Sequence, residues 1–468
     1  MRSKLRRLCL RMRKIFESPF FILFQLLLAV AVTTFNFEVA GAILFLLILL
    51  AVLFAAKDVT KTTLPFLLLT MVVIKLYDSY DTFLNTKMIP LLAALAVLTA
   101  LCMLAFFKRN LTYQKRGPSF YGVFAVAVAV TLGGFGTIKP EAYLSGTSLY
   151  YTIGLGFGMV LAYWLINGCC KNDENNSLGE SFVLVMTVVT LFGSFMVFEY
   201  YLENIKLVLA KDGIIPFQWR NNVSTFLMFG LPFPFYYSRK KWAVSFIGWA
   251  GYLALLLGGS RGGLLFGTVE MGLCVLLTLI FDKKHRRHNL IVLGAIAVVL
   301  AAFGRRLVPF FRYTLERIVD YKENKTRFGL FERATEDFRA NRVFGSGLAN
   351  WNNRDIHPSK RGALCWYHSA PFQIIGSFGI VGVVCFTLRF VTRVWVIVSR
   401  VNHFTLTMAV SFLGITMMSL VNPGEFCPLP YELITTMIFI LLEKTPQAIA
   451  VKTPRFVRRR RRLKNLRG

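Results

Sequence analysis

The strongest constraint on the fold is a series of apolar runs, each of about 17 to 22 residues, that recurs along the whole chain. A helix of this length crosses a hydrocarbon core of about 30 Å. Hydrophobic residues occupy 55% of the 468 positions, charged residues only 17%, and the mean hydropathy is +0.56. A soluble chain of this length would carry more charge, and its buried helices would show amphipathic stripes, which are few here. The sequence therefore predicts an all-α polytopic integral membrane protein.

A window of about 19 residues predicts about 12 to 14 transmembrane helices, and the lower number treats two short runs as re-entrant. The expected spans are 19–37, 39–56, 63–79, 88–107, 119–138, 149–168, 181–202, 221–237, 241–258, 261–281, 289–304, 370–397, 404–421 and 428–443. The first run follows the basic start MRSKLRRLCLRMRK, and no small-residue cleavage site separates it from the second run. We therefore expect a retained span there rather than a secretory signal.

Basic residues mark one side of the membrane. They cluster in the loops KRNLTYQKRG, SRKK and DKKHRRH, around Arg400, and in both termini. The alternate loops YDSYDTFLN, IKPEAYLSG and VNPGEF are poor in Lys and Arg. An excess of Lys and Arg in short loops marks the cytoplasmic side, so we expect both termini in the cytoplasm. The acidic loop CCKNDENNSLGE fits this pattern poorly.

This topology divides the chain into five segments. They are a basic cytoplasmic N-terminus at 1–18, a transmembrane bundle at 19–304, a long extracytoplasmic loop at 305–369, C-terminal transmembrane helices at 370–445 and a basic cytoplasmic tail at 446–468. The long loop is basic, and a loop of this length usually carries function. A basic surface that faces outward indicates an anionic ligand, although a loop packed on lipid headgroups is the alternative. Within it, RFGLFERATEDFRANRVFGSGLANW has the periodicity of an amphipathic helix that ends near FGSG.

The formal net charge of +30 lies largely in the two tails and the inner loops. A run of five arginines near the C-terminus directly follows a span, so attraction to anionic lipid explains it better than nucleic-acid binding. We expect membrane lipids and no nucleic acid among the partners. The eight cysteines show no zinc spacing, and no metal site is predicted. Cys365 and Cys427 would both face outward, either paired or as separate thiols.

The stretch LLLGGSRGGLLFG places a permanent cation, Arg261, at the outer seam of two apolar runs, with two glycines on each side of the Ser260-Arg261 pair. An arginine that reaches to the interface to anchor a span is one explanation, and an anion-binding arginine is the other. The long loop faces the same side. His368 also lies there, just before a span begins and next to the interfacial aromatic residues Trp366 and Tyr367.

The outer-face residues together resemble the O-antigen ligase and Wzy-type O-antigen polymerase superfamily of bacterial envelope glycosyltransferases. The resemblance covers about residues 220 to 390 and rests on the order of several short motifs. These motifs are Ser260-Arg261-Gly262, then Arg327 with Phe331 and Ala334, then Gly345 and Gly347, and then His368 with Gln373, Gly376, Gly379 and Gly382. Two positions depart from the family pattern, since Phe331 stands where Trp is frequent and Ser369 where Asn follows the histidine.

This resemblance implies transfer of a glycan from a polyprenyl diphosphate carrier to a hydroxyl of a saccharide acceptor, at the outer face of the bacterial cytoplasmic membrane. The leaving diphosphate holds the driving force, so no cofactor is expected. Fixed cations must meet the charge that the diphosphate gains, and arginine matches phosphate oxygens with its planar fork. A histidine takes the proton of the acceptor. The implied catalytic residues are His368, Arg261 and Arg327, and the implied substrate-binding residues are Ser260, Arg220, Arg333 and Gln373.

Two other classes of function remain open. A transporter or flippase of lipid-linked saccharide would carry charged residues at mid-membrane and internal repeats, for which Lys75, Glu199 and Glu270 are the few candidates. A non-catalytic scaffold of a polysaccharide assembly complex would tolerate loss of Arg261 and His368. Within the enzyme class, a ligase and a polymerase differ only in the acceptor, and the sequence does not separate them.

Overall fold

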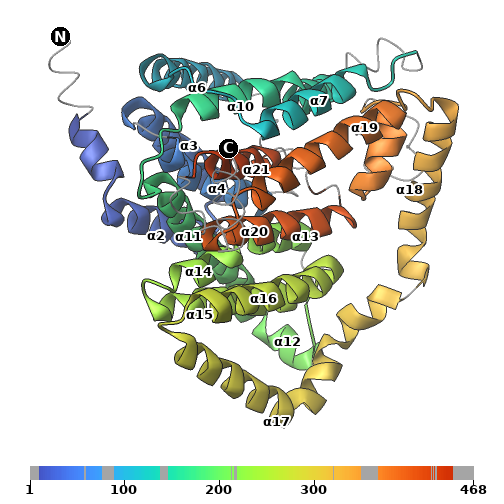
Figure 1. Cartoon of the computed structure of the whole chain (residues 1–468). Coiled ribbons are helices and arrows are strands. Elements are labelled where there is room, and N and C mark those ends of the chain that lie inside the picture. Colours follow the sequence, from blue (N-terminus) through green and yellow to red (C-terminus); the bar gives the residue numbers. More distant parts are fainter. Residues whose placement is uncertain are drawn as a thin grey trace, which may run out of the picture.

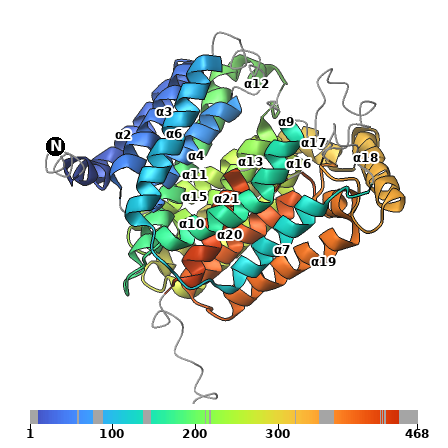
Figure 2. The same ribbon diagram turned by 90° about the horizontal axis from the view of Figure 1, so that it is seen from above.

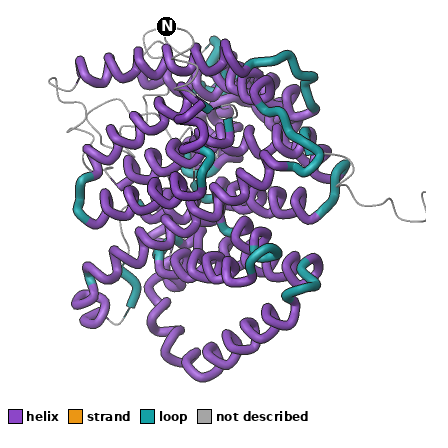
Figure 3. Tube along the Cα trace, turned by 90° about the vertical axis from the view of Figure 1, so that its left-hand side faces the viewer, coloured by secondary structure: helices purple, strands orange, loops and turns teal. Residues whose placement is uncertain are grey.

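The computed structural model describes residues 10–56, 59–75, 89–136, 146–211, 213–215, 219–319, 321–348, 367–422, 424, 426 and 430–445. All regular secondary structure in these ranges is helical, and they contain no β-strand (Figures 1 and 3). The predicted all-α polytopic membrane fold is therefore confirmed.

Most expected spans correspond to one helix. The helices are α2 (Pro19–Thr34), α3 (Glu38–Ala55), α4 (Thr60–Lys75), α6 (Ile89–Asn110), α7 (Pro118–Leu132), α9 (Gly146–Leu155), α10 (Phe157–Cys169), α11 (Ser177–Glu203), α12 (Ile205–Lys211), α13 (Arg220–Gly230), α14 (Pro232–Tyr237), the 3-10 turn η2 (Trp242–Val244), α15 (Ser245–Leu257), α16 (Arg261–Phe281), α17 (Arg286–Val319), α18 (Tyr321–Ala340), α19 (Ala370–Val398), α20 (His403–Ser419) and α21 (Pro430–Glu443). The expected span at 221–237 consists of α13 and α14, because Pro232 begins α14 and lacks an amide hydrogen for a continuous helix.

Five helices of the described chain are long and apolar enough to cross a membrane alone, and a bent pair of Leu10–Phe16 with Pro19–Thr34 raises the number to six. The five are Glu38–Ala55, Ser177–Glu203, Arg261–Phe281, Arg286–Arg312 within α17, and Ala370–Val398. The expected number of about 12 to 14 is reached only if shorter helices also span. Four of these shorter helices are apolar, namely Pro118–Leu132, Phe157–Cys169, Trp242–Leu257 and His403–Ser419.

Hydrogen bonds between helix ends define two opposite faces of the bundle. On the first, which we call the basic face, Arg109 Nη2 donates to Ala56 O at 3.0 Å, and Arg400 Nη1 donates to Leu442 O at 2.8 Å. These bonds join the end of α6 to that of α3, and the end of α19 to that of α21. On the second, which we call the pocket face, Lys75 Nζ donates to Thr33 O at 2.9 Å.

The start of α16 belongs to the pocket face. Tyr201, near the end of α11, donates its hydroxyl to the carbonyl of Leu257 at the end of α15, at 2.7 Å. The chain turns there and enters α16 at Arg261. Arg261 therefore lies at the opposite end of the bundle from the loops that carry Arg109 and Arg400, as the alternation of loop charges predicts.

The segment expected as a loop at 305–369 begins as helix. The long helix α17 continues past residue 304 to Val319, and α18 follows from Tyr321 (Figure 1). The part of α17 that is apolar enough to span the membrane, Arg286–Arg312, buries none of its residues inside the protein. A helix that is apolar and unburied is solvated by lipid, so α17 lies at the periphery of the bundle.

A break in α19 fixes the place of α18. Gly379 lies inside α19 with φ +60°, a conformation that residues with a Cβ rarely adopt. The broken turn frees backbone groups that pair with the segment after α18. Ile380 N donates to Arg342 O at 2.9 Å, and Gly347 N donates to Ser377 O at 2.8 Å. The expected helix end near FGSG is confirmed, because α18 ends at Ala340.

We predict that Gly379→Ala destabilises the protein by about 1 to 3 kcal/mol. An added Cβ would lie 2.6 Å from Arg342 O, and the backbone would be strained as well. Thermal unfolding in detergent would measure the loss. Gly272→Ala is the matched control, because Gly272 lies in α16 with no atom within 4 Å of an added Cβ. Equal melting temperatures of the two variants would contradict the role of the break.

Candidate functional site

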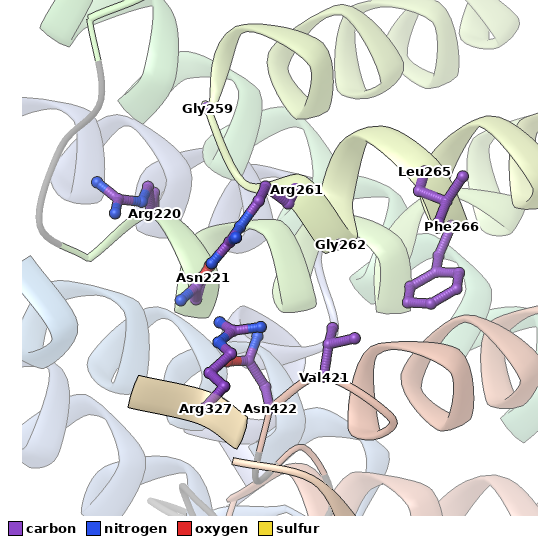
Figure 4. Close-up of a pocket in the computed structure, with 10 residues that line it drawn as sticks. All are labelled: Arg220, Asn221, Gly259, Arg261, Gly262, Leu265, Phe266, Arg327, Val421 and Asn422. Carbon is purple, nitrogen blue, oxygen red and sulfur yellow. The ribbon is translucent and has the colours of Figure 1, made fainter. Parts of the chain in front are cut away.

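Three arginines that are distant in the sequence line one pocket on the pocket face. Arg220 begins α13, Arg261 begins α16, and Arg327 lies in α18. The pocket encloses about 150 Å³. Figure 4 shows the side chains of Arg261 and Arg327 extending toward one another, whereas that of Arg220, at the start of α13, extends away from them. The other lining residues are Asn221, Gly259, Gly262, Leu265, Phe266, Val421 and Asn422.

The glycines of LLLGGSRGGLLFG allow the chain to turn and to pack tightly at this pocket. Gly259 has φ +67°, which lets the chain turn sharply from α15 into α16. Gly263 contacts α13 closely, since a Cβ there would lie 2.9 Å from Ser224 Oγ. Gly262 approaches α20 in the same way, with Met418 Sδ at 2.8 Å from such a Cβ. The small residues thus bring the starts of α13 and α16 and the end of α20 to one place.

Ser260 begins α16 and also orients a pocket residue. Its Oγ accepts the N–H of Gly263 at 3.3 Å, which caps the helix, and lies 3.0 Å from Asn221 Oδ1. With its lone pair engaged by the cap, the hydroxyl donates its proton to the Asn221 oxygen. The Asn221 amide nitrogen is then turned away from Ser260, and it adds a neutral donor to the pocket. Ser260 itself is almost fully buried and does not line the pocket.

The pocket is electropositive on several counts. Guanidinium groups stay protonated at physiological pH, so three lining residues carry positive charge. The N-terminus of α16, a helix of 21 residues, adds the partial positive charge of its free amide groups. None of the lining residues that the structure describes is acidic. Such a donor-rich site suits a ligand with several anionic oxygens, such as a phosphate or diphosphate.

His368 lies outside the pocket lining but is tied to the helix that carries Arg327. The preceding residue, Tyr367, is fully buried and donates its hydroxyl to Asp337 of α18. Ser369 occupies the N-cap position of α19, and its carbonyl accepts the N–H of Gln373 at 2.8 Å. Between these fixed neighbours His368 adopts φ +53°, an uncommon conformation for a residue with a Cβ. Such conformations cluster at functional sites, where the surroundings hold them.

The remaining two predicted residues lie in the joint between α18 and α19. Gln373 is fully buried, accepts the N–H of Tyr367 on Oε1 at 3.1 Å, and donates from Nε2 to Ser377 Oγ at 2.8 Å. Arg333 Nε lies 3.4 Å from Asp337 Oδ1. Both residues therefore contact protein groups that hold the joint, and neither lines the pocket. The rings of Phe331 in α18 and Phe372 in α19 also stack across this joint, with their centroids 4.2 Å apart.

Sequence reasoning missed the two uncharged polar residues of the pocket, Asn221 and Asn422. Asn221 follows Arg220 directly, but its role depends on the Ser260 hydroxyl, which is far away in the chain. Asn422 lies in VNPGEF, a loop that lacks basic residues and was used only for topology. Among the described residues, no group of three or more His, Cys, Asp or Glu side chains is placed to hold a metal ion. Cys365 and Cys427 lie outside the described residues.

We predict that Ser260→Ala lowers stability by about 0.5 to 2 kcal/mol, because the first turn of α16 loses its cap. Ser260→Thr keeps the hydroxyl and should retain most of the stability. Chemical unfolding of the purified variants would measure both effects. An alanine variant as stable as the wild type would show that the cap contributes nothing.

A comparison with known families matches the part of the chain that carries two of the pocket arginines. Residues 244–387 match the family model described as O-antigen ligase, and no curated protein matches the chain. The matched segment runs from the end of η2 into α19 and contains Arg261, Arg327 and His368, whereas Arg220 precedes it and Asn422 follows it. The resemblance to the O-antigen ligase and polymerase superfamily is thus confirmed for residues 244–387, and this match supports a membrane glycosyltransferase-like function in polysaccharide assembly.

Proposed function

We propose that the protein moves a glycan from a polyprenyl diphosphate carrier to an acceptor hydroxyl at the pocket face of the membrane. The placement of Arg220, Arg261 and Arg327 in the lining of one pocket, with Arg261 and Arg327 extending toward one another, supports this proposal most strongly. A diphosphate carries anionic oxygens on two phosphorus atoms, and the guanidinium forks of Arg261 and Arg327 can meet them together. A single arginine that anchors a span would need neither of the other two.

The reaction exchanges one glycosidic bond for another. The bond between the anomeric carbon and the diphosphate oxygen breaks, and its electron pair stays on the diphosphate. The acceptor oxygen bonds to the anomeric carbon and loses its proton. Negative charge therefore grows on the diphosphate in the transition state, and donors fixed in advance stabilise it most effectively. Arg261 and Arg327 supply two such donors, and the N-terminus of α16 adds its dipole.

We assign His368 as the base that takes the acceptor proton. Neutral imidazole can accept a proton near neutral pH, and general-base catalysis requires a positioned side chain. Tyr367 and Ser369 hold His368 at the start of α19, and the joint with α18 links it to Arg327. The acceptor saccharide would lie between the arginine pocket and this histidine. Arg333 and Gln373 would position the catalytic helices rather than bind substrate, because each contacts protein groups.

The carrier tail would follow the outer surface of α16. Leu265 and Phe266 form the apolar side of the pocket. Leu265, Val269 and Leu276 are each about half exposed and repeat at helical spacing along α16. An isoprenoid chain lying on this stripe would keep the diphosphate at the start of the helix.

The other functions find less support. Lys75, a candidate for transport, lies 3.1 Å from Glu38 Oε1 and 3.9 Å from Glu199 Oε2, in a cluster at the pocket-face end of its helix. A paired cluster at a helix end suits a structural role better than a transport path. Ligase and polymerase remain two forms of the same proposal. We place the protein in the bacterial cytoplasmic membrane with the pocket face outward and both termini in the cytoplasm.

We predict that Arg261→Lys and Arg327→Lys each reduce transfer about 100-fold or more, because lysine keeps the charge but loses the bidentate fork. The test is complementation of a deletion strain, scored by the length and linkage of its surface polysaccharide at matched membrane levels. Carrier-linked long chains in the variants would indicate a ligase, and single repeat units a polymerase. Arg312→Lys is the control, since Arg312 is 74% exposed on α17. Wild-type polysaccharide from both pocket variants would exclude this site.

We predict a graded effect at Asn221. Asn221→Ala removes one neutral donor and should lower transfer about 10-fold. Asn221→Asp has the same size but sets a carboxylate beside the anionic substrate, so it should lower transfer further, by about 100-fold or more. The two variants are compared at equal membrane levels. If aspartate and alanine reduced transfer equally, the pocket would not bind an anion next to residue 221.

A further inference from the structure

The buried hydroxyl of Tyr201, near the end of α11, joins two segments that lead into the arginine pocket. It donates to the carbonyl of Leu257 at 2.7 Å and accepts the N–H of Ile215 at 3.2 Å. Leu257 ends α15 and lies four residues before Arg261. Ile215 lies five residues before Arg220. One hydroxyl therefore contacts the backbone that leads to two of the three pocket arginines.

The first of these bonds holds the end of α15. In a continuous helix the carbonyl of Leu257 would accept the N–H of residue 261. The helix ends instead at Leu257, and Gly259 turns the chain with φ +67° before α16 begins at Arg261 (Figure 4). The Tyr201 hydroxyl donates to the carbonyl at this end. It therefore fixes the backbone directly before the turn that carries Arg261.

A neighbouring backbone bond extends this link to α17. Ile214, next to Ile215, donates its N–H to Phe310 O of α17 at 3.3 Å. The Phe310 side chain is half-buried and packs against the same apolar cluster that contains Tyr201. Phe310 thus attaches the peripheral helix α17 to the bundle. The helix that follows α17 is α18, which carries Arg327, the third pocket arginine.

The position of the backbone matters for a long side chain such as arginine. A guanidinium stabilises growing charge best when it is fixed in advance at the place where the charge appears. Arg261 reaches the pocket on a flexible stem, so the point where the stem begins must itself be held. Both groups that contact the Tyr201 hydroxyl are backbone groups, and leaving either of them buried without a partner would be costly.

We propose that Tyr201 is a positioning residue of the arginine pocket, which holds the start of α16 so that the Arg261 fork meets the leaving diphosphate. This role rests on the proposed function, because it requires that Arg261 binds the diphosphate. Tyr201 does not line the pocket and acts through the backbone. A misplacement of about 1 Å near a reacting group can lower a rate about 100-fold, so a remote hydroxyl can have a large effect.

Tyr201→Phe tests this proposal, because it keeps the ring and removes both hydrogen bonds. Transfer is measured with purified variants in lipid vesicles that contain a polyprenyl diphosphate-linked saccharide and a saccharide acceptor, and is expressed per folded protein. We expect a fall of about 10- to 100-fold. Tyr252→Phe is the matched control and should retain most of its transfer. The Tyr252 hydroxyl, 3.0 Å from Thr268 Oγ1, also joins α15 to α16, but within the helices rather than at the turn. Equal transfer by the two variants would overturn the proposal.

A double variant separates positioning from a loss of stability. If Tyr201 acts through Arg261, adding Tyr201→Phe to Arg261→Lys should lower transfer by less than about 3-fold further. A general loss of active protein would instead multiply with the effect of Arg261→Lys, and that result would overturn the proposal. Wild-type transfer by Arg261→Lys would contradict the proposed function itself. Reduced transfer by Arg261→Lys together with wild-type transfer by Tyr201→Phe would contradict only the role of Tyr201.

Discussion

The interlocking of α19 with the segment after α18 is the interaction on which the proposed site depends. The break at Gly379 exposes backbone groups that a continuous helix would use internally, and residues 342 to 347 pair with them. Gly345 fits against the chain there, since a Cβ would lie 2.5 Å from the Ser377 carbonyl carbon. This joint sets the position of α18, and α18 carries Arg327 to the other two arginines. The same joint holds Tyr367 and so the residue that follows it, His368.

Charge is distributed so that the pocket keeps its positive potential. Elsewhere in the bundle, two buried arginines share one carboxylate: Arg393 Nη2 lies 2.9 Å from Glu432 Oε1 and Arg389 Nη1 lies 3.1 Å from it. This cluster joins α21 to α19, and α7 packs along α19 (Figure 2). Removing Glu432 would leave two buried cations uncompensated, which is costly inside a membrane protein. Carboxylates thus stabilise the scaffold, while the described lining of the arginine pocket contains none.

Much of this arrangement could be predicted from the sequence because it follows from local rules. The length of the apolar runs predicted the helices, and the loop charges predicted which helix ends share a face. The glycines around Arg261 and the family resemblance together indicated Arg261, Arg327 and Arg220 as candidate site residues. The joint between α18 and α19 could not be predicted, because it depends on backbone groups that meet only after folding. Asn221 illustrates the same limit, since its orientation is set by the hydroxyl of Ser260. Gln373 and Arg333 were both predicted to bind substrate, yet only the structure shows that they contact protein groups at the joint and do not line the pocket.

The central claim is that the arginine pocket holds a diphosphate while a glycan leaves it. The most direct measurement uses the purified protein in lipid vesicles with a polyprenyl diphosphate-linked saccharide, a saccharide acceptor and no nucleotide. Released polyprenyl diphosphate and transferred glycan are quantified together over time. The account predicts that the two products appear in equal amounts and stop together when the donor is exhausted. Movement of intact donor across the vesicle membrane, with neither product formed, would contradict it.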